Sequence, residues 1–122
     1  MIELFARLLL AAALLGGEVH EGVAPHYAAG VMERVAGRRG MEYPACAISS
    51  PYWPVGARVW VYGVATQRLE RCTVVDVSHP RDRARHLRTR RVAELGEREA
   101  RRLCPSIRGR PEECKIVVVR ME

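Results

Sequence analysis

Alternation of apolar and polar residues predicts a hairpin near the middle of the chain. Residues 58–62 place Val59 and Val61 on one face and larger or charged side chains on the other, which is the period of a β-strand. A second run of strand character, residues 69–76, follows after a short turn. Two such runs joined by a short turn predict an antiparallel pair.

Shorter segments on both sides of the hairpin predict further strands and helices. Apolar strand character recurs in residues 23–28, 43–48 and 115–121. Residues 31–40 carry apolar side chains at helical spacing, so we expect a short helix or a loop there. Residues 97–103 begin with acids and end with bases, which complements a helix dipole and predicts a helix. About six short strands with one late helix predict a small, mainly β barrel.

Two segments are expected to be loops. Residues 104–114 contain two prolines and a glycine. Residues 78–91 contain six arginines and cannot form a core, so we expect a surface loop in which His86 is solvated. The stretch Arg81–Arg91 is also a candidate for binding phosphates or an anionic wall polymer, although a solvated loop is the simpler interpretation.

Length and composition are those of one globular domain. The chain has 122 residues, of which 48% are hydrophobic and only 6% aromatic, so the core must consist mainly of Val, Ala, Leu and Ile. The net charge is +6, and Lys115 is the only lysine. So much arginine indicates either a GC-rich genome or an acidic polymer as partner, such as nucleic acid or an anionic wall.

The four cysteines indicate two disulfides. They are Cys46, Cys72, Cys104 and Cys114. No CxxC pair occurs, which argues against a zinc site. Three pairings of four cysteines exist, and sequence alone does not choose between them. We expect Cys104–Cys114 to close a short loop before the last strand, and Cys46–Cys72 to clamp the hairpin to the preceding strand.

The start of the chain is typical of an export signal. Residues 8–15 form an apolar run after Arg7 and before two glycines, and the run is too short for a membrane span. We therefore expect a signal-peptide-like segment at residues 1–17 and a single domain at 18–122. A rival interpretation is an N-terminal amphipathic or core helix.

Three stretches, taken in order, carry a family resemblance. Residues 53–61 read Trp-Pro-Val-Gly-Ala-Arg-Val-Trp-Val, residues 72–76 read Cys-Thr-Val-Val-Asp with Pro80 shortly after, and residues 91–96 read Arg-Val-Ala-Glu-Leu-Gly. Over residues 47–121 the chain resembles the RlpA-like double-psi β-barrel family. That family includes septal-ring lytic transglycosylases, and its more distant relatives are expansins and barwin-like and family-45 endoglucanases.

The resemblance implies a six-stranded double-psi β-barrel with one or two short helices. The acid/base carboxyl of the lytic transglycosylases falls on Asp76, and the second acidic position falls on Glu94. Ser50 stands where active members commonly have a histidine, so Ser50 or Glu94 is the candidate catalytic residue in support of Asp76. A serine is no general base at neutral pH without a base beside it. Tyr27 matches an aromatic residue near the family's first strand, which makes it a candidate substrate-binding residue.

The two carboxyls also have structural interpretations. Asp76 can cap the turn after its strand or pair with an arginine, and Glu94, in an apolar segment, favours an ion pair with arginine. If both lined one groove, they would form the usual pair for glycoside cleavage. Ser78 and His79 follow directly, but sequence neighbours seldom form a catalytic triad.

Other candidate binding residues lie around the hairpin. Its aromatic cluster comprises Tyr52, Trp53, Trp60 and Tyr62. Exposed aromatic faces would stack on sugar rings, whereas buried ones would pack the barrel, and Tyr52 and Trp53 are the candidate glycan binders. His79 is the candidate replacement for the missing family histidine, and Arg81 is a candidate contact for an anionic group.

The expected function is that of an exported, wall-associated barrel. We expect a secreted, periplasmic or wall-bound monomer that binds peptidoglycan or another wall glycan and cleaves it as a lytic transglycosylase, without metal or cofactor. One alternative is a non-catalytic module that holds a glycan or protein with the same barrel. Another is a basic nucleic-acid-binding or protein-binding factor in the cytosol, which would need reduced cysteines.

Overall fold

The computed structural model describes residues 7, 17–107, 110–111 and 113–121. Apart from Arg7 and Gly17, the signal-like segment at residues 1–17 therefore lies outside the described residues. Among the residues described, no helix is long and apolar enough to cross a membrane.

The described part of the chain is mainly β. The strands are β1 (Val19–Ala24), β2 (Ala47–Ser50), β3 (Arg58–Gly63), β4 (Arg68–Val77), β5 (Glu94–Leu95), β6 (Ser106–Ile107), β7 (Arg110–Pro111) and β8 (Cys114–Arg120). The described helices are α2 (Val31–Arg38), α3 (Pro80–Arg88) and α4 (Glu97–Leu103). Six strands form one mixed sheet in the order β1-β8-β3-β4-β2-β5, and β6 pairs with β7.

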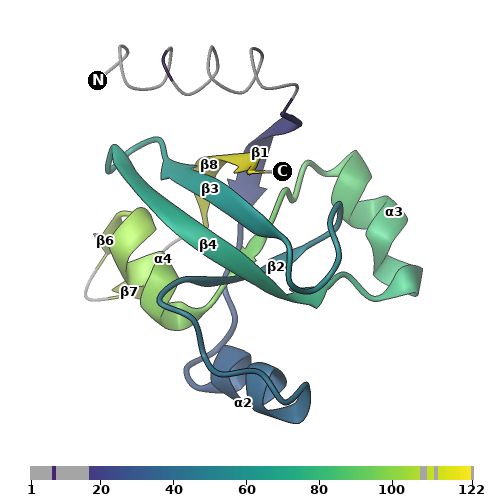
Figure 1. Ribbon diagram of the computed structural model, residues 1–122. Helices are drawn as coiled ribbons and strands as arrows, with labels where there is room; N and C mark the ends of the chain where they lie inside the picture. Colours follow the sequence, from purple (N-terminus) through teal and green to yellow (C-terminus); the bar gives the residue numbers. More distant parts are fainter. Residues whose placement is uncertain (1–6, 8–16, 108–109, 112, 122) are drawn as a thin grey trace.

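The six-stranded sheet curls into an open half-barrel (Figure 1). The predicted hairpin is confirmed, since β3 pairs antiparallel with β4. β2 lies parallel to β4 and antiparallel to β5. The mainly β class is confirmed, whereas the described chain has three short helices rather than one or two.

Backbone hydrogen bonds link the two edges of the sheet beyond its regular pairing. Val23 donates to the carbonyl of Arg90 at 2.9 Å and accepts from Val92 at 3.1 Å. Tyr27 donates to the carbonyl of Leu95 at 2.8 Å. These bonds form two isolated parallel bridges, and they bring the chain at the end of β1 beside the chain around β5.

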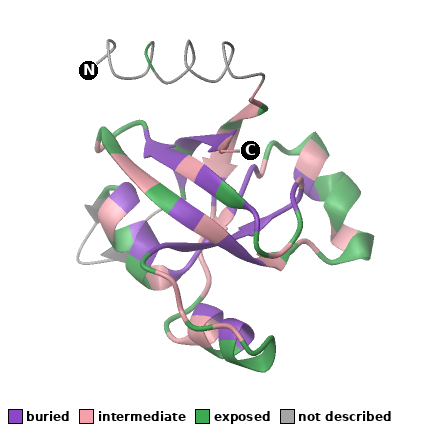
Figure 2. Ribbon diagram, viewed as in Figure 1, coloured by how far each residue is buried: buried purple, intermediate pink, exposed green. Residues whose placement is uncertain are grey.

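Alternate residues of the central strands enter different apolar clusters. Val59 and Val61 are fully buried in the largest cluster, as their strand period predicts. Tyr62 and Trp60 face the other side of β3, where they pack with Val117 and others. β8 is buried on both faces, which explains why its sequence is a continuous valine run rather than an alternation. Figure 2 shows the buried residues gathered along these strands, with exposed residues on α3 and the outer side of α2.

Both expected disulfides are confirmed. Cys46 is bonded to Cys72, and their Cα atoms are 4.5 Å apart. Cys104 is bonded to Cys114, and their Cα atoms are 5.5 Å apart. The first bridge joins the residue before β2 to the middle of β4. Two disulfides are compatible with an extracellular or otherwise oxidising compartment.

The prediction of a loop at residues 78–91 is wrong, because most of this segment forms helix α3. His79 caps the helix by accepting from the amide of Arg81 at 3.2 Å, and Pro80 occupies the first turn, where it needs no amide partner. Asp82 lies in the first turn and basic residues lie in the last, which complements the helix dipole. An apolar stripe is nearly absent, so a search for apolar periodicity misses this helix.

Helix α4 begins and ends where its charge pattern predicts, and it also buries a carboxyl group. Glu99 is fully buried and accepts hydrogen bonds from the Tyr43 hydroxyl at 3.0 Å and from the amide of Ala47 at 2.8 Å. A Cβ at Gly96 would lie 2.3 Å from the Glu99 carboxylate, so the helix start has no room for a side chain. These contacts fix α4 against β2.

Candidate functional site

The two candidate carboxyls share one face of the sheet. Ser49 on β2 is paired with Asp76 on β4 and with Glu94 on β5. Residues directly opposite each other on neighbouring strands project from the same face. Neighbouring strands lie about 4.8 Å apart, so the backbones of Asp76 and Glu94 are separated by about 10 Å. We call the group around them the polar cluster; its members are Tyr27, Arg39, Ser49, Asp76, Ser78, His86 and Glu94.

An irregularity in strand pairing aims Asp76 at this face. The register between β2 and β4 shifts between Ile48 and Ser49, so that Val75 is passed over and Asp76 stands opposite Ser49. Val75 packs into the apolar cluster beneath α2, which includes Met32. A bulge of this kind re-aims a side chain and is common beside active sites.

Asp76 is held by two partners from the N-terminal part of the chain. The Tyr27 hydroxyl donates to Oδ2 at 2.9 Å, and Nη2 of Arg39 donates to Oδ1 at 2.7 Å. The Arg39 side chain is 40% exposed and that of Asp76 is 19% exposed. Burial raises the pKa of Tyr27 well above its ordinary value, so its hydroxyl stays a donor. Asp76 therefore pairs with an arginine, as its structural interpretation predicts, and it also accepts a hydrogen bond from Tyr27.

Glu94 lies in a different environment from Asp76. Burial raises its pKa, and the charge of Asp76 acts in the same direction, whereas His86 and Arg91 lower it. Its ion-pair partner is His86 rather than an arginine, with 4.0 Å between Nε2 and Oε1. The raised pKa favours a carboxyl that holds its proton longer than an exposed glutamate does.

His86 is buried, which corrects the expectation that it is solvated. The residue is 6% exposed. Its Nδ1 lies 2.7 Å from the Ser78 hydroxyl, and its Nε2 faces Glu94. His86 projects from α3 onto the sheet. A loop at residues 78–91 would leave this histidine in solvent, and only the helical form of the segment turns it inward.

Ser50 holds a loop instead of facing the carboxyls. It is 1% exposed, and its hydroxyl accepts from the amides of Tyr52 and Trp53 at 3.0 and 3.1 Å. Within the part of the chain that the structure describes, no hydrogen bond joins Ser50 to Asp76 or Glu94. Its side chain thus fixes the turn that leads from β2 into the loop before β3.

The prediction of one aromatic cluster is wrong, because the four aromatic residues lie in two separate groups. Tyr52 stacks on His20 with 3.6 Å between ring centroids, and Trp53 lies tilted against both. Trp60 and Tyr62 pack on a different apolar cluster. Trp53 is 3% exposed and belongs to the core, so only Tyr52 of the two candidate glycan binders retains accessible surface.

The other two candidate binding residues lie at the start of α3. The ring of His79 is exposed and caps the helix through Nδ1, away from the inward face that His86 occupies. Arg81 is exposed on the same turn. Arg83 donates through Nε to the carbonyl of Pro51 at 2.9 Å, which ties the helix to the loop after β2.

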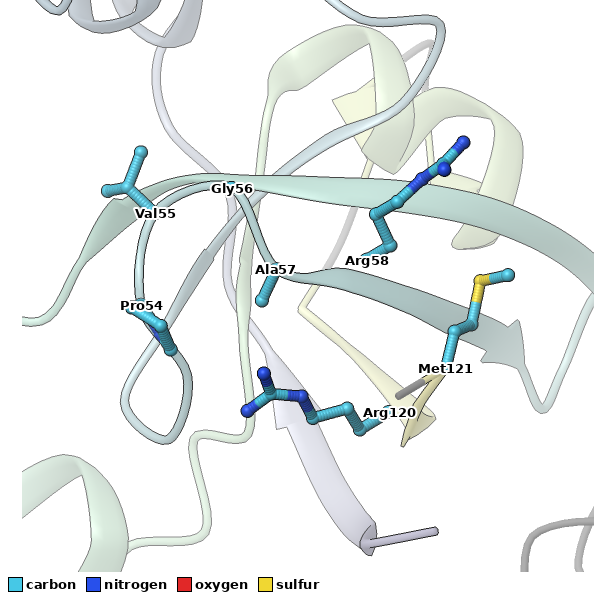
Figure 3. A pocket seen from close by; sticks show the side chains of 7 residues that line it. All are labelled: Pro54, Val55, Gly56, Ala57, Arg58, Arg120 and Met121. Atoms are coloured by element: carbon cyan, nitrogen blue, oxygen red, sulfur yellow. The ribbon is translucent and has the colours of Figure 1, made fainter. Parts of the chain in front are cut away.

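A pocket of about 580 Å³ opens beside that loop (Figure 3). Its lining residues are Pro54, Val55, Gly56, Ala57, Arg58, Arg120 and Met121. The Arg120 side chain extends toward the loop, whereas that of Arg58 points away from it. None of the polar cluster lines this pocket. We base the candidate site on the polar cluster, because the pocket contains no carboxyl, hydroxyl or imidazole group.

Several members of the polar cluster were not predicted from the sequence. Arg39 and Ser49 carry no motif, and only the strand register and the fold of the α2 segment bring them beside Asp76. Ser78 and His86 are eight residues apart, and their contact depends on α3. The one available signal was Pro80 followed by Asp82, which is typical of a helix start.

Comparisons add no family to this picture. No protein-family model matches the sequence, and no curated protein matches it either. Among the described residues, no three His, Cys, Asp or Glu side chains are grouped as metal ligands.

Proposed function

We propose that the protein is an exported, wall-associated double-psi barrel that binds peptidoglycan glycan and cleaves it as a lytic transglycosylase. The observation that carries the proposal is the placement of Asp76 and Glu94 on one sheet face, on either side of Ser49. Carboxyl pairs that cleave glycosidic bonds stand about 5 to 9.5 Å apart. Side chains that lean toward each other from backbones about 10 Å apart reach that range.

The environments of the two carboxyls support different roles. The resemblance assigns the acid/base role to Asp76, which Arg39 and Tyr27 bind as a carboxylate. Glu94 has a raised pKa because of burial, and a carboxyl of that kind donates a proton to a leaving oxygen. In the proposed mechanism Glu94 protonates the glycosidic oxygen. Asp76 stabilises the positive charge on the sugar and accepts the proton of the attacking sugar hydroxyl.

The barrel itself is part of the proposal. Support comes from the parallel bridges between the end of β1 and the segment around β5, together with the parallel pair of β2 and β4. These bridges join the two edges of the half-barrel, and contact between those edges is what the closed form implied by the family resemblance requires. The two disulfides and the signal-like start support an oxidising, extracytoplasmic site of action.

Incubation with isolated peptidoglycan sacculi tests the proposal. Oxidised protein is mixed with sacculi, pelleted, and the soluble fraction is analysed by mass spectrometry. We expect anhydro-muropeptides from the unmodified protein and none from Asp76→Asn or Glu94→Gln. Glu21→Gln, at an exposed position of β1, is the matched control and should release the same fragments. Failure to bind sacculi would overturn both the enzymatic and the wall-binding parts of the proposal.

A non-catalytic glycan-binding module is the second candidate. The observation that favours it is that Asp76 is already occupied by Arg39 and Tyr27, while Ser50, at the family's histidine position, holds a loop. Pelleting with sacculi without released fragments would identify this function. Loss of pelleting in Tyr52→Ala would then locate the glycan contact on the partly exposed aromatic ring.

A further inference from the structure

Two side chains beside the carboxyl pair, Ser78 and His86, have no role in the proposed glycan cleavage, and they connect to Glu94 through a hydrogen bond and an ion pair. Ser78 lies at the junction between β4 and α3, His86 projects from α3, and Glu94 lies on β5. The Ser78 hydroxyl is 2.7 Å from Nδ1 of His86. Nε2 of the same ring is 4.0 Å from Oε1 of Glu94. The order hydroxyl, imidazole, carboxyl is that of an activated serine nucleophile.

We propose that Ser78 is the nucleophile of an acyl-transfer site, with His86 as its general base and Glu94 as a positioning residue. His86 is buried, so its ring is held by its two neighbours and not by solvent. The serine uses Nδ1 and the carboxylate faces Nε2. The assignment therefore rests on the roles and contacts of the three groups, which is how such sites are recognised.

The junction also supplies a candidate donor for the developing oxyanion. In strand-to-helix nucleophile sites, the peptide N–H of the residue after the serine serves this purpose. That residue is His79, and within the described residues its peptide N–H has no hydrogen-bond partner. By contrast, the amides of Arg81, Asp82 and Arg83 are all taken up by His79 itself.

The chemistry is hydrolysis of a carboxylic ester. The Ser78 oxygen attacks the carbonyl carbon while its proton moves to Nδ1 of His86, and Glu94 stabilises the resulting imidazolium. The alcohol leaves with that proton, and an acyl-serine remains. Water then attacks the acyl group, gives its proton to His86, and releases the acid as the proton returns to Ser78. Because Ser78 is only partly exposed, we expect esters with a short acyl chain.

Covalent labelling of the intact, oxidised protein tests the inference directly. The protein is incubated with an alkyl fluorophosphonate, and the adduct is located by tandem mass spectrometry. We expect one adduct, on Ser78, and hydrolysis of p-nitrophenyl acetate that the adduct abolishes. His86→Gln should slow labelling by about 100-fold or more, which is the usual size of a general-base effect. Thr89→Ala removes a hydroxyl from the other end of α3 and should label at the original rate.

The role of Glu94 needs a readout that a structural defect would not produce. Glu94→Gln should lower kcat for the acetate ester with KM unchanged, and thermal unfolding should show that each variant is folded. Absence of an adduct on Ser78 in the unmodified protein would overturn the inference, and so would an equal labelling rate in a folded His86→Gln variant. Sacculus cleavage is scored separately, so failure of this inference and failure of the proposed function are distinguishable.

Discussion

Two neighbouring rungs of the same three strands differ completely in chemistry. In the first, Ile48 is paired with Val74 and Leu95, and all three side chains are fully buried in the core. In the second, one residue further along β2, Ser49 is paired with Asp76 and Glu94. We call them the apolar rung and the polar rung.

The difference separates the part of the sheet that stabilises the fold from the part that carries the candidate site. Apolar side chains on the inner face gain the hydrophobic stabilisation that holds the half-barrel together. Partial burial of two carboxyls costs stability unless partners compensate, and here Arg39, Tyr27 and His86 do so. A bulge in β4 is also needed to bring Asp76 into the polar rung. An arrangement with these costs is typical of functional sites.

The largest expected effect separates the two rungs by stability. Ile48→Ala should lower the free energy of unfolding by about 2–5 kcal/mol, because it leaves a cavity in the core. Ser49→Ala removes one buried hydroxyl and should cost about 1 kcal/mol. Urea unfolding of both variants measures the difference. Equal losses would contradict the assignment of the apolar rung as the stabilising one.

The disulfide beside the rungs should contribute nearly as much. Cys46–Cys72 holds β2 against β4 and spans 26 residues, whereas Cys104–Cys114 spans 10. The loop-entropy relation gives losses of about 3.5 and about 2.7 kcal/mol for the two double alanine variants. Urea unfolding measures both losses as shifts of the midpoint, provided that the dependence of the unfolding free energy on urea concentration is the same in all three proteins. A larger loss of stability on removal of the Cys104–Cys114 bridge would show that loop length does not determine which disulfide stabilises the fold more.

The polar rung should make stability depend on pH. Burial raises the pKa of Glu94, so the native state keeps this proton more tightly than the unfolded chain does. The contribution is fully present below the ordinary glutamate pKa of about 4.3 and is lost as the pH rises through the raised value. Glutamine does not ionise, so the stability of Glu94→Gln relative to the unmodified protein should increase with pH over that window. A difference between the two proteins that does not change with pH would contradict the raised pKa of Glu94.

The smallest expected effect concerns the partner of Asp76. Arg39 is 40% exposed, so its ion pair is screened by solvent and Arg39→Ala should cost between 0 and about 1 kcal/mol. The loss should shrink further in high salt. Thermal unfolding at low and high salt provides the measurement. A loss comparable to that of Ile48→Ala would mean that the polar rung is a structural support rather than a site.

Local patterns in the sequence predicted much of the fold. The period of residues 58–62, the valine run of β8 and the charge order of α4 are all encoded within a few neighbouring residues. The disulfide pairing was also predicted, because each bridge closes onto a neighbouring element. Helix α3 was missed because caps and charges define it, with almost no apolar stripe.

The polar cluster was predicted only in part. Asp76 and Glu94 were identified through the resemblance, and Tyr27 proved to contact Asp76. Ser49 and Arg39 could not be identified, because their role depends on the shifted register and on contacts over long sequence separations. His86 was assigned to solvent, since only the helical form of its segment turns it inward.

The measurement that tests the polar rung most directly is a carbon-13 NMR titration of the Asp76 and Glu94 carboxyl groups. Burial predicts that Glu94 titrates above the ordinary glutamate range. The shared face predicts that Asp76→Asn moves the Glu94 pKa downward, because the negative charge that adds to the effect of burial is gone. Glu21→Gln should leave the titration unchanged. A Glu94 carboxyl that titrates in the ordinary range and does not respond to Asp76→Asn would contradict the shared face and the site built on it.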